Sequence, residues 1–424
     1  MKPLFPNSLS AFLRIFESLK HKNFSLYFWG QTASLIGSWM QNIAMSWLVY
    51  RLTGSVVLLG TVAFLAQIPT LFFTPFSGVL ADRYDRRKLL MLSQSLYMCL
   101  SIILALLTLT HLIQAWQILA LSLIAGFTNA LDMPVRQSFY TTLVPPELLP
   151  NAIALNSAIM NGSRLIGPAI GGFLIQLIGE GGCFAINAIS FLFVLGALSK
   201  IVFSEQKDRI KTDPMMEVRE GYQYVKSNIP IRIILLTLSV FCFCILSYAT
   251  FMPAYVKDVL LKDSKSLGFI MSAVGIGALS STFYLAARRT VVGLGKVVVI
   301  TIVSASIALM PAFFIKSLGL ILPLSICAGF SITCSIAAIN TLLQVLTTES
   351  MRGRVMSYFS MCFLGSSAVG CLFWSYVAKI ITLPWTMACC CFICLITAFI
   401  FAKYLPLVRT HCRPIYVEKG IIKE

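Results

Sequence analysis

The sequence predicts an all-α integral membrane protein with twelve transmembrane helices in two six-helix halves. Hydrophobic residues make up 58% of its 424 positions and charged residues only 12%, about half the charge of an ordinary soluble domain. Residues 52–81, 89–131 and 317–348 contain no Asp, Glu, Lys or Arg. Because about 20 helical residues cross a bilayer core of roughly 30 Å, each run is long enough for one crossing, and the longest for two.

The apolar runs divide the chain into five parts. Residues 1–23 form an N-terminal segment with an amphipathic helical face, which we expect to lie flat on the inner membrane surface. The N-terminal half occupies 24–203, a polar linker 204–230, the C-terminal half 231–405, and a basic tail 406–424. The expected spans are 24–49, 56–80, 89–110, 115–138, 152–178, 182–203, 231–256, 266–287, 297–315, 318–345, 355–378 and 384–405.

The distribution of Lys and Arg predicts the orientation of these spans. The segments on the side of the N-terminus contain 26 of the 33 Lys and Arg residues, and the opposite loops contain 6. This asymmetry places both termini and the linker in the cytoplasm. The net charge of +17 then faces anionic lipid headgroups, so no nucleic-acid partner is expected.

The most specific motif lies between the second and third spans. It reads Gly78-Val-Leu-Ala-Asp82-Arg83-Tyr-Asp85-Arg86-Arg87-Lys88. An ordinary positive-inside loop explains the arginines but not the glycine four residues before Asp82. The motif resembles the signature loop G-x-x-x-D-R-x-G-R-R of the major facilitator superfamily, with Asp85 in place of the second glycine. That departure is similar to the transmembrane secretion effector branch, which includes the enterobactin exporter and macrolide efflux transporters.

Further segments resemble the same branch. They are 23–31, 37–41, 47–55, 132–137, 161–172 and, more faintly, 352–357. The resemblance implies a transporter that rocks between two conformations, in which Gly78, Asp82, Arg83, Arg86 and Arg87 act as a conformational switch. It also implies that Asp82 contacts the chain near 354–357 in one conformation, and that the protein is a monomer.

A glycine-rich stretch in the fifth span, Gly167-Pro168-Ala-Ile-Gly171-Gly172, looks like the motif that the superfamily uses in antiporters. Proline weakens the helical hydrogen-bond ladder, and glycines permit close helix packing. Two interpretations stay open: a bend that serves as a gate, and tight packing without gating.

Three charged residues are candidates for substrate or proton binding. Arg164 is the only charge deep in an expected span, where it costs about 2.5–3.5 kcal/mol on insertion scales. It either attracts an anionic substrate into a cavity or locks onto Asp132, Asn129 or a carbonyl. Asp132 and Arg136 are four residues apart and share a helical face. Asp132 is therefore the carboxylate candidate for proton coupling, and a plain helix-end ion pair is the alternative.

A set of amide and aromatic residues completes the candidate site. By resemblance, the first, fourth, seventh and tenth spans face a central cavity, and buried amides need partners. The candidates on these spans are Gln31, Trp39, Gln41, Asn42, Asn129, Tyr248, Phe251, Tyr255, Asn340 and Gln344. A lining with few charges suits a bulky amphipathic molecule.

Together these features predict a secondary exporter of the bacterial inner membrane that moves a siderophore-like or macrolide-like compound by alternating access. The sequence contains no Walker loop, which favours protons as the driving ion. The alternatives are a lysophospholipid or lipid flippase of the same fold and a nutrient importer. An intramembrane enzyme is disfavoured, since no histidine lies inside an expected span. We expect no cofactor and no metal.

Overall fold

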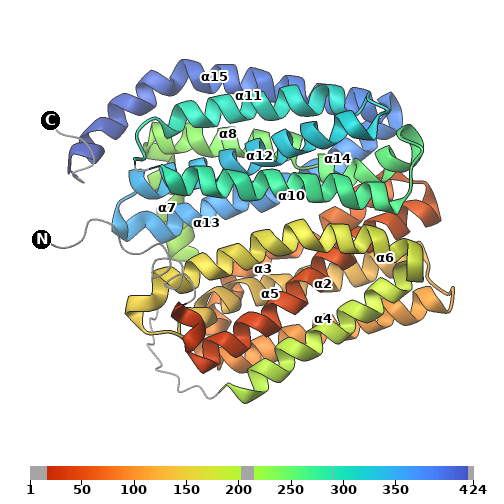
Figure 1. Ribbon diagram of the computed structural model, residues 1–424. Helices are drawn as coiled ribbons and strands as arrows, with labels where there is room; N and C mark the ends of the chain where they lie inside the picture. Colours follow the sequence, from red (N-terminus) through yellow and green to blue (C-terminus); the bar gives the residue numbers. More distant parts are fainter. Residues whose placement is uncertain (1–16, 202–213, 289, 419–424) are drawn as a thin grey trace, which may run out of the picture. The chain divides into compact units, whose positions relative to one another are not determined.

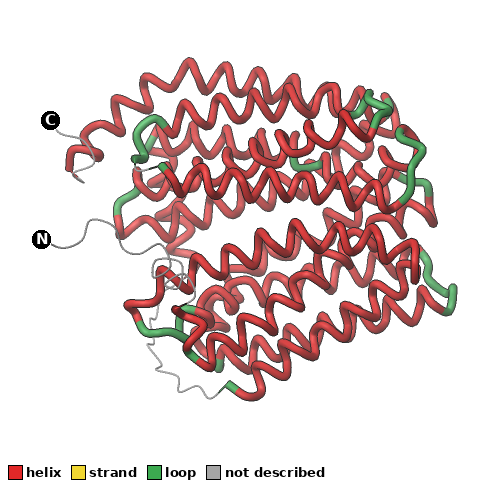
Figure 2. Tube along the Cα trace, in the orientation of Figure 1, coloured by secondary structure: helices red, strands yellow, loops and turns green. Residues whose placement is uncertain are grey.

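The computed structural model describes residues 17–201, 214–288 and 290–418. Throughout this part of the chain the regular structure is helical (Figure 2), in agreement with the predicted all-α class. The first sixteen residues of the predicted amphipathic segment lie outside the described residues. A short 3₁₀ turn, η1 (Glu17–Lys20), precedes the first long helix.

The N-terminal half contains five long helices (Figure 1). They are α2 (Lys22–Thr53), α3 (Val56–Arg83), α4 (Arg86–Leu109), α5 (Ala115–Tyr140) and α6 (Leu149–Lys200), with the 3₁₀ turn η2 (Pro146–Leu148) before α6. Helix α6 is long enough for two crossings. Its two arms fold back at Gly179, whose φ of +72° lies in the left-handed region that glycine adopts readily.

The C-terminal half begins with the linker helix α7 (Pro214–Ser227). The further helices are α8 (Ile229–Ile245), α9 (Tyr248–Ala254), the π-helix η3 (Tyr255–Val259), α10 (Ser264–Ala287), α11 (Leu294–Ala312), α12 (Leu318–Leu346), the 3₁₀ turn η4 (Glu349–Met351), α13 (Arg352–Ser360), the π-helix η5 (Met361–Gly365), α14 (Ser366–Ile381) and α15 (Leu383–Glu418). The π turn η5 lies inside the expected span 355–378, and η3 begins at the last two residues of the expected span 231–256.

The described helices account for all twelve predicted spans. Ten segments are long and apolar enough to cross a membrane, and the segment that contains α6 supplies two crossings. Helix α2 supplies the twelfth, although its amides lower its mean hydropathy below that of the others. Segments α8 to η3 form the seventh span, and α13 to α14 form the eleventh.

The chain forms two compact units whose boundary differs from the predicted halves. Unit 1 contains α2 up to Met45, α3 from Phe72, and α4 to α6. Unit 2 contains the segment 46–71 together with α7 to α15. Segment 46–71 belongs to unit 2 because it packs there closely: a Cβ built on Gly60 would lie 2.5 Å from the carbonyl oxygen of Cys371.

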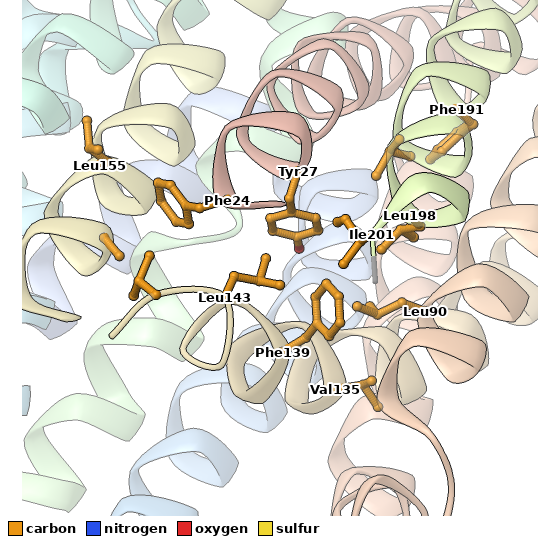
Figure 3. Close-up of a cluster of buried hydrophobic side chains, with 13 residues drawn as sticks. Phe24, Tyr27, Leu90, Val135, Phe139, Leu143, Leu155, Phe191, Leu198 and Ile201 are labelled. Atoms are coloured by element: carbon orange, nitrogen blue, oxygen red, sulfur yellow. The ribbon is translucent and has the colours of Figure 1, made fainter. Parts of the chain in front are cut away.

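The core of unit 1 gathers at one end of its helices. Phe24 and Tyr27 of α2 meet Phe139 of α5, Leu90 of α4 and Leu198 of α6 (Figure 3). The rings of Tyr27 and Phe139 pack edge to face, with centroids 5.5 Å apart. This aromatic cluster fixes the spacing of four helices around the charged residues described below.

Unit 2 is built by close backbone contacts between helices. Helix α12 packs against α10 and α11, and α15 packs against α8 and α11. A Cβ built on Gly277 would lie 2.0 Å from the carbonyl oxygen of Ile326, and one on Gly329 would lie 2.1 Å from that of Val274. Small residues let α10 and α12 approach to backbone contact, which is the usual way that membrane helices gain packing energy.

Candidate functional site

The signature loop lies at the junction of α3 and α4. Gly78, Asp82 and Arg83 occupy the last turns of α3, and their side chains lie outside the described part of the structure. Their predicted switch function stays a prediction. Asp85, which replaces the glycine of the general motif, is the N-cap of α4: its carboxylate accepts from the amides of Arg87 at 2.8 Å and Lys88 at 3.2 Å. Such a cap stabilises a helix start by about 1 kcal/mol.

The side chain of Arg87 binds the C-terminal end of α6. Its Nε donates to the carbonyl oxygen of Leu198 at 2.6 Å, and a terminal nitrogen donates to that of Ser199 at 2.7 Å. A cation at a helix C-terminus satisfies orphan carbonyls and interacts favourably with the helix dipole. The neighbouring Arg86 has a buried Nε with no hydrogen-bond partner among the described residues. The contact of Arg87 with α6 was not predicted, because the sequence of a basic loop does not indicate which helix end its arginines bind.

The glycine-rich stretch of α6 packs against α2. A Cβ built on Gly167 would lie 2.5 Å from the Cβ of Trp39, and one on Gly171 would lie 3.1 Å from the carbonyl oxygen of Met40. Pro168 and Gly172 are buried in the same region. The close packing that the sequence offered as one interpretation is therefore present, and the gating function of the motif stays a prediction.

Asp132 is the centre of a buried polar network between α4 and α5. Its side chain is fully buried. One carboxylate oxygen accepts from Ser93 at 2.8 Å and from Gln94 at 2.7 Å, and the other pairs with Arg136. The Arg136 side chain is 20% exposed. A buried ion pair is stabilising only where further hydrogen bonds satisfy its remaining groups, and here both donors come from α4.

A small pocket lies beside this network in unit 1. Its volume is about 10 Å³, room for about one water molecule and far below the range of pockets that hold drug-sized ligands. It is lined by Phe24, Tyr27, Phe28, Gln31, Tyr140, Asn156 and Ile159. The predicted site residue Gln31 is thus a buried wall residue of this pocket, with 3% of its surface exposed.

Gln41 joins three helices of unit 1. Its side-chain oxygen accepts from Ser101 on α4 at 2.9 Å and from Asn187 on α6 at 2.7 Å. Gly37 makes room for this contact, since a Cβ there would lie 2.4 Å from the amide oxygen of Asn187. Asn187 was not among the residues predicted for the site. An amide in an uncharged span was the sign in the sequence that it needs a partner, but its partner, Gln41, is 146 residues away.

Arg164 lies over an aromatic ring. The guanidinium carbon is 5.5 Å from the ring centroid of Trp39, a distance at which a cation is attracted to the face of a tryptophan. Neither residue is fully buried, and Asn42, on the same helix as Trp39, is exposed. Among the described residues, Asp132 bonds to Ser93, Gln94 and Arg136. The described contacts therefore bring Arg164 to Trp39 and not to Asp132.

The other candidates are spread over both units. Asn129 is half-buried on α5. In unit 2 Tyr248 is buried, and the hydroxyl of the fully buried Tyr255 donates to the carbonyl oxygen of Ile315 at 2.5 Å. On α12 the Gln344 amide donates to Asn340 at 2.5 Å. Among the candidates of unit 1, the described contacts bring Arg164 to Trp39 and Arg136 to Asp132. The cavity function of the set stays a prediction.

Twelve membrane-spanning helices with buried polar groups at their interfaces define a multi-pass membrane transporter. A family model of the transmembrane secretion effector matches residues 14–412. The chain belongs to this family of the major facilitator superfamily, as its signature loop indicated, and such proteins are transporters and not enzymes.

Characterised relatives and a solved structure agree with this assignment. The staphyloferrin A transporter of Staphylococcus aureus is 26% identical over 290 residues, which are 68% of this chain and 73% of that protein. The macrolide efflux protein A of Streptococcus pyogenes is 24% identical over 252 residues, 56% of this chain and 61% of that protein. The crystal structure of the nucleoside transporter NupG superposes with a TM-score of 0.69 at 16% identity, over 91% of this chain and 99% of that one. At that identity the likeness to NupG shows the fold alone.

Proposed function

We propose that this transporter exports a bulky amphipathic compound across a bacterial inner membrane with both termini in the cytoplasm. The compound is siderophore-like, with an anionic group, and a macrolide-like compound is the alternative. A proton gradient drives the export by alternating access. The family description and the efflux protein of Streptococcus pyogenes support the outward direction, and the staphyloferrin A transporter supports a siderophore-like substrate.

The observation that carries the substrate class is the placement of Arg164 over Trp39. A charge inside a membrane span faces protein or water and marks a substrate pathway by default. The described part of the structure gives Arg164 an aromatic partner but no carboxylate partner. Its guanidinium therefore keeps hydrogen-bond donors for a carboxylate or phosphate of a ligand, while the tryptophan ring supplies apolar surface.

The coupling ion is argued from Asp132. It is a buried carboxylate inside a span, and carboxylates at such sites form proton relays in transporters. Protonation of Asp132 neutralises the charge that faces Arg136 and so changes the interactions between α4 and α5.

Transport into inverted membrane vesicles tests the proposal. Labelled citrate-type siderophores, macrolides and lysophospholipids are offered with an imposed pH gradient, with and without a protonophore. We expect uptake of an anionic compound that the protonophore abolishes. Uptake that ignores the pH gradient would exclude proton coupling, and redistribution of lysophospholipid alone would identify a flippase.

Two variants test the function of Arg164. Arg164→Gln is expected to lower uptake of the anionic compound at least tenfold, because the guanidinium is lost, whereas uptake of uncharged compounds changes little. Arg288→Gln is the matched control. Like Arg164, Arg288 lies over an aromatic ring, with its guanidinium carbon 6.0 Å from the ring centroid of Tyr284. Unlike Arg164, it lies at the end of a helix, α10. Equal losses in both variants would contradict an anion-binding function of Arg164.

A further inference from the structure

The segment 46–71 is joined to unit 1 by two continuous helices. Helix α2 passes from unit 1 into unit 2 between Met45 and Ser46, and α3 returns to unit 1 between Leu71 and Phe72. Both helices are regular α-helices across these boundaries. A movement of one unit against the other must therefore bend the two helices or detach the segment 46–71 from the rest of unit 2.

The α3 part of this segment contacts unit 2 by close packing. A Cβ built on Gly60 would lie 2.5 Å from the carbonyl oxygen of Cys371 on α14, and one built on Gly365 of η5 would lie 3.1 Å from the side chain of Leu71. Small residues permit such close approach of membrane helices. The end of α2 contacts unit 2 by a different kind of interaction.

Tyr50, near the C-terminal end of α2, contacts two charged residues of η3. Its hydroxyl group donates a hydrogen bond to the carboxylate of Asp258. The Nζ atom of Lys257 lies 5.5 Å from the centroid of its ring, a distance at which a cation is attracted to an aromatic face. The Tyr50 side chain is buried, whereas Lys257 and Asp258 are exposed. Water therefore reaches both charged groups, and can hydrate them when the contact breaks.

The backbone that carries Asp258 departs from a regular α-helix. Residues 255–259 form the π turn η3, which is closed by a hydrogen bond from the amide of Leu260 to the carbonyl oxygen of Tyr255 at 3.0 Å. Leu261, the next residue, has a φ of +52°, in the left-handed region that leucine rarely adopts. Both π turns and strained residues are frequent at functional sites. These features favour a function for the contact of Asp258 over a plain hydrogen bond at a helix end.

We propose that Tyr50 and Asp258 form a latch, which binds the segment 46–71 to unit 2 in one conformation and releases it in the other. This inference rests on the proposed alternating access. Both residues lie in expected loops on the side opposite the termini, so the latch keeps that end of the transporter closed. On release, the Tyr50 hydroxyl and the Asp258 carboxylate exchange their mutual hydrogen bond for hydrogen bonds to water.

Amide hydrogen exchange of the full-length protein in lipid nanodiscs tests the latch without depending on transport. Tyr50→Phe removes only the hydroxyl group. We expect about tenfold faster exchange in peptides that cover residues 50–56 and 255–262, because a hydrogen bond to a charged group contributes roughly this factor or more to an equilibrium constant. Asp258→Asn keeps a neutral acceptor and should give a smaller increase.

Tyr284→Phe is the matched control for this measurement. The hydroxyl of Tyr284 also contacts a charged group, since it accepts from Arg288 at 3.2 Å, and the guanidinium of Arg288 lies over its ring. This hydrogen bond joins two positions of one helix, α10 and its C-cap, so we expect its loss to leave exchange in both peptides unchanged. Unchanged exchange in a folded Tyr50→Phe, or an equal increase in Tyr284→Phe, would overturn the inference.

A reversible cross-link separates a latch that opens from a permanent contact. A double variant, Tyr50→Cys with Asp258→Cys, is joined by a short bifunctional thiosulfonate reagent and released by reduction. Each single variant, treated in the same way, accounts for the native cysteines. We expect the link to abolish vesicle transport and reduction to restore it, and transport by the linked protein would overturn the inference. Absence of transport of the anionic compound by the unmodified protein would reject the proposed function, whereas the exchange measurement would still decide the latch.

Discussion

Both units pack helices closely at glycines, but they differ in the polar groups that lie between their helices. Unit 1 holds charged and amide groups between helices, with the Asp132–Arg136 pair at α4 and α5 and the Gln41–Asn187 hydrogen bond between α2 and α6. Unit 2 uses hydroxyl pairs such as Thr301 with Ser335 at 2.7 Å and the backbone contacts of its glycines. Its described ion pairs, Glu220–Arg354 and Glu349–Arg352, lie at the linker helix and at the start of α13.

This difference indicates that the two units contribute differently to transport and to helix packing. Charges inside a membrane are costly and are retained where they serve transport, whereas close packing of small residues serves association of helices. Under the proposed function, Asp132 and Arg164, the charged groups proposed to bind protons and substrate, lie in unit 1, and unit 2 contains closely packed helices. Substitutions of equal size in the two units then have different consequences.

The largest effect is expected for Asp132→Ala in unit 1. The substitution leaves Arg136 mostly buried without its carboxylate, which costs about 3–5 kcal/mol, and it removes the proposed proton site. We expect both a lower unfolding temperature in detergent and loss of pH-driven vesicle transport. A double variant, Asp132→Ala with Arg136→Met, should recover much of the stability but no transport. Recovery of transport in the double variant would contradict the division between the units.

A smaller effect is expected for Gly329→Ala in unit 2. The added methyl group would lie 2.1 Å from the carbonyl oxygen of Val274, so α10 and α12 must separate at a cost of about 1–3 kcal/mol. Thermal unfolding in detergent measures this loss. Gly162→Ala in α6 is the control, because a Cβ there meets nothing within 4 Å, and alanine favours a helix over glycine by up to about 1 kcal/mol. Equal destabilisation by both substitutions would show that the contact between α10 and α12 is not decisive.

The smallest effect is expected for Thr301→Val in unit 2. The variant keeps the shape of the side chain and removes one hydrogen bond to Ser335, and such bonds average about 0.6 kcal/mol in membrane proteins. Gln41→Leu in unit 1 should cost more, about 1–3 kcal/mol, because Ser101 and Asn187 both lose their acceptor. Unfolding midpoints of the two variants give the comparison, and a greater loss in Thr301→Val would reverse our assignment of the units.

Much of the fold was accessible from the sequence, since hydropathy alone marks where a chain crosses a membrane. All twelve predicted spans are present, including the pair that meets near Gly179. The π turns η3 and η5 were not predicted, because hydropathy does not distinguish an α-helical from a π-helical hydrogen-bond pattern. The close packing of residues 46–71 within unit 2 depends on contacts between helices distant in sequence, which hydropathy does not indicate.

The site was predicted residue by residue but not contact by contact. The spacing of Asp132 and Arg136 predicted their ion pair correctly, because partners four residues apart share a helical face. The hydrogen bonds from Ser93 and Gln94 to Asp132 cross from one helix to another, and so does the contact of Arg87 with the end of α6. Such contacts depend on the azimuth of each helix in the bundle, which a single sequence does not specify.

The turn at Gly179 has a practical consequence for topology mapping. The fifth and sixth spans meet with a single non-helical residue between them, and the adjacent Gly181 lies against Leu109, within 3 Å of a Cβ built there. Epitope tags or protease sites inserted at this point would force apart two helices that meet at a tight turn. Reporter fusions for this protein therefore belong in the loop around His111, a residue that is exposed and follows the end of α4.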